Sequence, residues 1–212
     1  MDIRREMRKK QRSPEAAVQQ AERAAEVVAS LTGSSAHEAA VGCKAIIRLR
    51  SHAVAQEAAV AIIKVLKSHA ADAEVAAHGC WALAHICKAS AMTQQLAVDE
   101  GAFDAVNASL EHHPAAIMPA CAALEAMCTG VGAASRRERA REAGVITSLM
   151  AELRSSRNAE KAPGSSSGGG GSTLFPSDVT MACCAALRSI TRDSMQLQQA
   201  ALDEGASVQW LV

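Results

Sequence analysis

The sequence predicts an all-α fold, and three observations support this. Hydrophobic residues make up 49% of the 212 residues, whereas aromatic residues make up only 2% and Tyr is absent. Alanine, the residue with the highest intrinsic helix propensity, occurs 47 times. A β-sandwich or barrel normally contains more aromatic and β-branched residues, and a disordered chain lacks this apolar content. We therefore expect closely packed helices around a sizeable core.

The N-terminal residues differ from the rest in charge. Residues 1–12 carry six basic and two acidic side chains, a local charge of +4 in a chain whose net charge is zero. We interpret residues 1–13 as a basic tail, either a solvated terminus or a nuclear-import signal. No secretory signal follows this tail, and no apolar run reaches the roughly 18 residues of a membrane span. We expect a cytoplasmic or nuclear protein that uses no membrane, and the zero net charge gives no reason to expect nucleic acid as a partner.

Two sequence patterns alternate along the chain. The first contains an aligned cysteine and occurs as AVGCKAIIRL (40–49), AHGCWALAHI (77–86), MPACAALEAM (118–127) and ACCAALRSI (182–190). The second contains an aligned glycine and occurs as AVDEGAFDAV (97–106), AREAGVITSL (140–149) and ALDEGASVQW (201–210). Successive cysteines are 37, 41 and 63 residues apart, so the period is near 40 and one repeat is longer. Recurrence at this spacing is typical of stacked helical units.

Each unit is expected to consist of helices. Apolar residues recur every three or four positions over 72–89, which predicts a helix with one buried face. Gly101 and Gly144 are expected to begin new helices, because glycine permits a sharp turn. Pro119 lacks a backbone donor, so the helix that contains it should start late or kink. The Gly/Ser-rich stretch 155–177 is expected to be a flexible insertion within the fourth unit.

These motifs resemble the armadillo family, with HEAT repeats as a near neighbour. The phrase GCWALAHI (79–86) resembles the family's third helix, and EGAFDAV (100–106) resembles the helix before it. The resemblance implies a right-handed α-solenoid whose third helices line a concave groove. About four armadillo-like repeats and a partial fifth would fill residues 14–212. The expected bounds are roughly 14–52, 53–91, 92–132, 133–194 and 195–212.

The end of the sequence suggests that the array is not closed. Residues 201–212 stop partway through an expected second helix, with Trp210, Leu211 and Val212 as the last residues. Terminal repeats of a solenoid normally carry a polar cap over their apolar face. We therefore expect either a piece of a longer array or a chain that is completed by a partner.

The cysteines and histidines do not predict a metal or catalytic site. His78 and His85 fall on one helix face and Cys80 and Cys87 on another, so one metal ion cannot collect all four. The aligned Cys43, Cys80, Cys121 and Cys184 are expected to form a ladder of small buried residues without disulfides. No cysteine has a paired base and orienting acid, and no phosphate-binding loop is present. We expect no enzyme activity, no cofactor and no small-molecule substrate.

The candidate binding site is a stripe on the third helices. His78, Trp81, His85 and Lys88 recur at steps that place them on one continuous face. Armadillo proteins that bind basic peptides carry a Trp that is followed four residues later by an Asn. The resemblance implies that Trp81 matches this Trp and that His85 stands in the place of the Asn. Basic residues on the other third helices complete the candidate set, which is Lys44, Arg48, His78, Trp81, His85, Lys88, Arg188 and Arg192.

The sequence thus predicts a protein–protein interaction scaffold that binds a protein or peptide segment along these helices. The stripe is basic at both ends, which suits an acidic or mixed segment. Two other functions stay open at this point. In the first alternative, the chain is the regulatory repeat region of a larger enzyme such as a kinase. In the second, it is a divergent nuclear-transport adaptor that uses residues 1–12.

Overall fold

A computed structural model of the chain describes residues 14–31, 35–49, 55–161 and 176–206. Within these ranges the chain forms α-helices and one short 3-10 helix, and no strand. The prediction of an all-helical fold is confirmed. In chain order the elements are α2 (Pro14–Leu31), α3 (Ala36–Leu49), α4 (Ala55–Ser68), α5 (Ala73–Cys87), α6 (Ala91–Asp99), α7 (Ala102–His112), η1 (Pro114–Ala116), α8 (Ile117–Met127), α9 (Ala133–Glu142), α10 (Val145–Lys161), α11 (Pro176–Thr191) and α12 (Met195–Asp203).

Local sequence signals set several of the helix starts. Asp72, Ser90 and Ser194 are the N-caps of α5, α6 and α12, and each side chain accepts a hydrogen bond from the backbone N–H three residues later. Gly101 and Gly144 have φ angles of +81° and +74° and immediately precede α7 and α10. Both glycines therefore begin new helices, as the sequence predicts, because a side chain rarely tolerates this backbone conformation.

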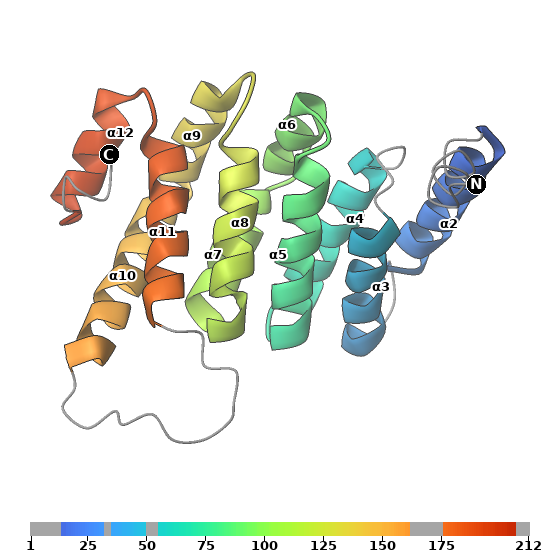
Figure 1. The fold of residues 1–212 in the computed structure, drawn as a ribbon, viewed down its shortest axis with the longest axis horizontal. Helices are drawn as coiled ribbons and strands as arrows, with labels where there is room; N and C mark the ends of the chain where they lie inside the picture. Colours follow the sequence, from blue (N-terminus) through green and yellow to red (C-terminus); the bar gives the residue numbers. More distant parts are fainter. Residues whose placement is uncertain (1–13, 32–34, 50–54, 162–175, 207–212) are drawn as a thin grey trace, which may run out of the picture.

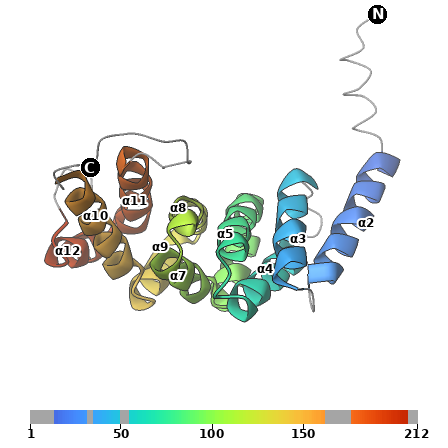
Figure 2. The same cartoon turned by 90° about the horizontal axis from the view of Figure 1, so that it is seen from below.

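The helices form two packed layers. Figure 1 shows α3, α5, α8 and α11 standing side by side in one row, and successive members of this row are in contact. The helices α2, α4, α7 and α10 contact one another in the same order, and Figure 2 shows α4 and α7 beneath α5 and α8. The short helices α6, α9 and α12 lie along one edge, next to the C-terminal ends of α5, α8 and α11 (Figure 1). We refer to the exposed side of the first row as the third-helix face.

Small residues let the two layers approach closely. A Cβ on Gly42 would lie 2.5 Å from a methyl group of Leu31, and a Cβ on Gly79 would lie 2.6 Å from a methyl group of Leu66. The same glycine–leucine contact thus joins α3 to α2 and α5 to α4. Alanines are also buried along the first row: Ala39, Ala40, Ala76, Ala82, Ala120, Ala123 and Ala186. Ala45 and Ala77 of the same helices are half-buried.

The cysteine ladder differs from its prediction at one position. Cys43, Cys80 and Cys121 are buried, and all seven cysteines are free thiols. Cys184 is only half-buried, and the thiol that meets Cys121 is Cys183, with 3.8 Å between the two sulfur atoms. Cys183 rather than Cys184 therefore faces α8.

Two further boundaries can be compared with the sequence. Pro119 lies in the first turn of α8, after η1, where its missing N–H has no intrahelical partner to lose, so the expected late start is confirmed. The expected insertion at 155–177 is too long, because α10 continues to Lys161 and α11 already begins at Pro176. Arg, Ala, Glu and Lys between 155 and 161 favour helix and extend α10.

Three predictions fall outside the described residues. They are the basic tail (1–13), the Gly/Ser-rich loop (162–175) and the open end of the array (207–212).

Arg136 of α9 is the largest of the fully buried side chains, with 1% of its surface exposed. Its guanidinium donates to the carbonyl oxygens of Met127, Val131 and Thr129 and to Oε1 of Gln94, at distances of 2.6 to 3.0 Å. These carbonyls lie at and just beyond the C-terminal end of α8, where the helix leaves acceptors without intrahelical donors. Arg136 therefore caps α8 and ties α6 to it.

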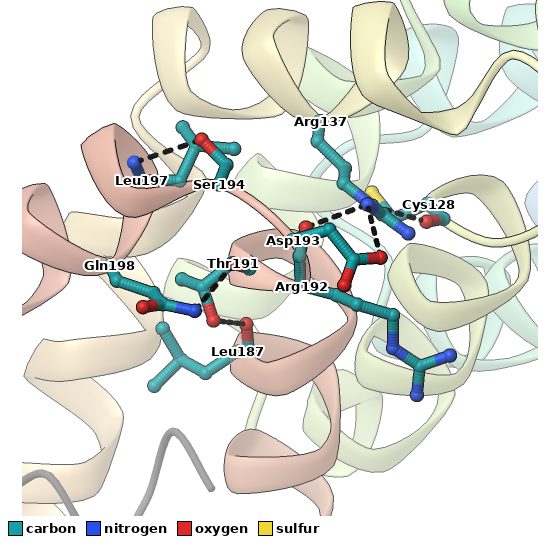
Figure 3. A network of polar contacts seen from close by, with 9 residues as sticks. All are labelled: Cys128, Arg137, Leu187, Thr191, Arg192, Asp193, Ser194, Leu197 and Gln198. Atoms are coloured by element: carbon teal, nitrogen blue, oxygen red, sulfur yellow. Dashed lines mark hydrogen bonds and ion pairs between the residues drawn. The ribbon is translucent and has the colours of Figure 1, made fainter.

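Arg137 extends this network to the next unit (Figure 3). Its Nε donates to the carbonyl oxygen of Cys128 at 2.9 Å, and its Nη1 donates to the carbonyl oxygen of Arg192 at 2.7 Å. Asp193, which has a left-handed φ of +57° and follows the end of α11, lies 3.9 Å from the same Nη1. On α12, Gln198 donates to the carbonyl oxygen of Thr191 at 3.4 Å. Side chains of the edge helices thus hold the C-terminal ends of α8 and α11.

We predict that Arg136→Ala lowers the free energy of unfolding by about 3 kcal/mol, because it leaves several buried carbonyls without donors. The measurement is urea unfolding followed by circular dichroism at 222 nm. Arg139→Ala on the same helix is the matched control. Arg139 is exposed and pairs with Asp99 at 3.1 Å, so its loss should cost at most about 1 kcal/mol. Equal effects of the two substitutions would contradict the capping role.

Candidate functional site

The structure places the eight predicted site residues on or just beyond three helices of the first row. Those from α3 and α5 lie on neighbouring helices in contact, whereas those from α11 are separated from them by α8. Four side chains are exposed (Arg48, Lys88, Arg188 and Arg192), Trp81 is 43% exposed, and three are half-buried (Lys44, His78 and His85). The stripe on α5 is thus brought together with its α3 neighbours, and the two late arginines stand apart.

Trp81 is a large apolar side chain on the surface of an otherwise well-buried helix. Its sequence neighbours Cys80, Ala82 and Leu83 are buried, because they point toward the adjoining helices. The other described aromatic side chain, Phe103, is also buried. Trp is enriched among residues that dominate binding energy at protein interfaces. An exposed Trp in this position is therefore the strongest single candidate for a contact with a partner.

His78 links the two neighbouring helices electrostatically. Partial burial lowers the pKa of His78 from its ordinary value, the charge of Lys44 on α3 lowers this pKa further, and Glu74 on its own helix opposes both effects. The influence of Lys44 indicates that the α3 and α5 side chains share one local environment. Neutral imidazole at position 78 is thereby favoured at neutral pH, and His78 offers a donor and an acceptor to a ligand.

The two late arginines differ in their surroundings. Arg192 follows α11, and Figure 3 shows its side chain pointing away from Arg137 while its backbone carbonyl accepts the hydrogen bond from that residue. Arg188 lies in the last turn of α11, and its charge partly offsets the rise that burial causes in the pKa of Cys184. Cations in these positions interact favourably with the negative end of the helix dipole.

Several surface residues of the same row were not identified from the sequence. Val41 on α3 is 49% exposed, Met181 on α11 is 64% exposed, and Met118 on α8 is half-buried. Ala122 on α8, which the sequence aligns with Trp81, is half-buried as well. A signal for Met181 was present, because it lies 63 residues after Met118, the same separation as between the aligned cysteines. Glu125 on α8 is exposed as well. The third-helix face is therefore more apolar than the basic stripe alone indicates.

Two surface hollows lie outside the predicted site. One, of about 220 Å³, is lined by residues of α6, α7 and α9 and the turns next to them, including the charged side chains of Asp104, Arg139 and Glu142. The other, of about 390 Å³, lies between α2 and α4 and is lined mainly by Val28, Val60 and Ala61. Neither hollow contains a predicted site residue. In the described ranges, no group of three or more His, Cys, Asp or Glu side chains is placed to hold a metal ion.

The comparisons with known proteins give no family. No family model matches the chain, and no curated protein matches it. Among the helices described, none is both long and apolar enough to cross a membrane. The geometry of the helices and their exposed side chains therefore carries the functional argument.

We predict that Lys44→Ala raises the pKa of His78, because it removes a positive charge that disfavours the imidazolium. The measurement is the pH titration of the His78 ring signals by two-dimensional NMR. Lys64→Ala on α4 removes the same charge from the other layer and should leave the titration unchanged. An unaltered His78 pKa in the Lys44 variant would contradict the conclusion that the α3 and α5 side chains share one environment.

The seven cysteines should react with a maleimide at very different rates. Six are buried and Cys184 is half-buried, so Cys184 should be labelled first in the folded protein. Burial raises the pKa of Cys43, Cys80, Cys87 and Cys128 to about 12, which suppresses their reactive thiolates further. Mass spectrometry of the intact protein should show one early adduct, which Cys184→Ser removes. Several adducts forming together would contradict the described packing.

Proposed function

We propose that the chain is an armadillo-type, right-handed α-solenoid that binds a partner protein or peptide segment along a concave third-helix face. The observation that carries the proposal is the exposure of Trp81 on α5, a helix that ends just before Lys88 and contacts α3, which carries Lys44. Binding would then depend on a prearranged surface rather than on covalent chemistry. The protein would act as a scaffold or adaptor in the cytoplasm or nucleus.

Contacts that recur from unit to unit support the solenoid part of the proposal. Lys67 at the end of α4 donates to the carbonyl oxygen of Glu100, just before Gly101, at 2.7 Å. Arg154 on α10 makes the corresponding contact with the carbonyl oxygen of Glu204, just before Gly205. Such nearest-neighbour contacts at equivalent positions are the basis of solenoid stability. The glycine–leucine contacts also recur at equivalent positions, but each of them lies within one of the first two units.

We favour binding over catalysis because of the state of the candidate nucleophiles. Burial raises the pKa of most of the cysteine thiols, and an activated cysteine needs the opposite shift together with a nearby base. The half-buried Cys184 also has a raised pKa, caused first by burial and then by Cys183. A role as the regulatory region of a larger enzyme is compatible with the same surface.

A nuclear-import adaptor is less well supported than a general scaffold. Gripping an extended basic peptide by an aromatic wall requires a Trp on several successive units, because each module adds affinity only when its neighbours also engage. The positions equivalent to Trp81 are Lys44, Ala122 and Ala185. The wall is thus reduced to one aromatic residue.

We predict that Trp81→Ala weakens partner binding at least about tenfold, or about 1.4 kcal/mol, and leaves the helical content unchanged. Partners retained by the wild-type protein in quantitative affinity purification would be measured against the variant, and then titrated by calorimetry. Met92→Ala, which truncates an exposed Met at the start of α6, is the control. Equal retention by wild type and the Trp81 variant would remove Trp81 from the site and contradict the proposed face.

A further inference from the structure

Apolar and charged side chains are segregated on the third-helix face. Exposed or half-buried apolar side chains occur on all four helices of the row and make up what we call the apolar band: Val41, Trp81, Met118, Ala122 and Met181. The half-buried Lys44 of α3 lies among them, at the position that aligns with Trp81. Basic side chains gather at the C-terminal ends of the same helices, which we call the basic edge: Arg48, Lys88, Arg188 and Arg192. The C-terminal ends of α5, α8 and α11 point to one side of the row, toward α6, α9 and α12 (Figure 1).

The opposite edge of the face carries carboxylates. Glu38, Glu74 and Asp178 are exposed in the first turns of α3, α5 and α11. The backbone N–H and the hydroxyl of Ser35 both donate to Glu38, which lowers its pKa and keeps it charged. The face is therefore polarised across the row, from acidic to apolar to basic.

This arrangement selects the chemistry of a partner. Apolar side chains of a bound segment would be buried on the apolar band, and its carboxylates would meet the basic edge. A basic segment would bring like charges against Arg48 and Lys88, and such juxtaposition costs affinity and slows association. A phosphate backbone offers no apolar groups to the band and would approach the carboxylates of the opposite edge.

We propose that the partner segment is acidic and apolar, with Asp or Glu side chains directed at the basic edge and aliphatic or aromatic side chains seated around Trp81. This inference rests on the proposed function and names the partner class of the same surface. Three side chains depart from this charge pattern: Glu125 on α8, Asp193 just beyond α11 at the basic edge, and Lys44 in the middle of α3. Carboxylates of the partner are thus expected opposite α3, α5 and α11 rather than opposite α8.

The first experiment selects binders from a random library of 16-residue peptides displayed on phage. Wild-type protein is the bait, and phage that also bind the Trp81→Ala variant are removed. The expected result is Trp81-dependent peptides in which Asp and Glu outnumber Lys and Arg at least threefold relative to the unselected library, with enrichment of Leu, Ile or Phe. Trp81-dependent peptides that are basic or lack apolar residues would overturn the inference.

The second experiment tests the basic edge with the selected peptides. The double variant Lys88→Glu and Arg192→Glu should bind them at least tenfold more weakly, and their affinity for wild-type protein should fall as salt is raised. Lys64→Glu, which changes an exposed lysine of α4 in the other layer, should bind within twofold of wild type. Thermal unfolding of all variants checks that each folds. Equal losses in the edge and control variants would overturn the inference.

The outcomes separate the inference from the proposed function. Recovery of no Trp81-dependent peptide would count against the binding face itself. Recovery of Trp81-dependent peptides that are insensitive to the Lys88 and Arg192 variant would keep the face and reject the acidic partner. Tight, Trp81-dependent binding of a 20-nucleotide single-stranded RNA in a parallel fluorescence titration would overturn the inference of an acidic protein segment and indicate nucleic acid as the partner.

Discussion

The alignment of the first row depends on side chains that occupy the C-terminal ends of its helices. A helix leaves its last carbonyl groups without intrahelical donors, and these acceptors are costly to bury unpaired. Arg136 satisfies the carbonyls at the end of α8, and Arg137 joins that end to the carbonyl of Arg192 beyond α11. The same role falls to Gln94, which donates to the carbonyl of Ala126 at 2.9 Å. Two guanidiniums and one amide therefore hold the C-terminal end of α8 and join it to the end of α11.

This constraint has a direct consequence for the surface. Because the helix ends are held at a common edge, exposed residues near each C-terminus fall into one line, and residues of the middle turns fall into another. Trp81 and Met181 thus belong to one band although 100 residues separate them in sequence. Small side chains between the helices keep the spacing short, as the 3.8 Å contact between Cys121 and Cys183 illustrates. The polarity of the third-helix face is a product of helix alignment rather than of any local motif.

Sequence patterns identified the helices, the repeat and the exposed Trp81, but they missed features that depend on position within the stack. Cys184 occupies the same place in the repeat pattern as Cys121, yet it is half-buried, and its neighbour Cys183 makes the contact with Cys121 instead. In the sequence, Arg136 is one of several charged residues of α9 and has no feature that predicts burial. In the structure it is the largest of the fully buried side chains among the described residues. The end of α10 at Lys161 was also missed, since good helix formers continue a helix into a stretch that composition assigns to a loop.

By itself, the sequence determined the all-helical fold, the helix starts at capping and glycine residues, and the stripe of His78, Trp81 and His85 on one helix face. These follow from local propensity and from the 3.6-residue period, which act within a single helix. Only the tertiary structure decided that Val41 and Met181 share a surface with Trp81, that Lys44 influences the pKa of His78, and that Arg136 is buried. These features depend on which helices are neighbours and on how their ends align, and that information is absent from any one repeat.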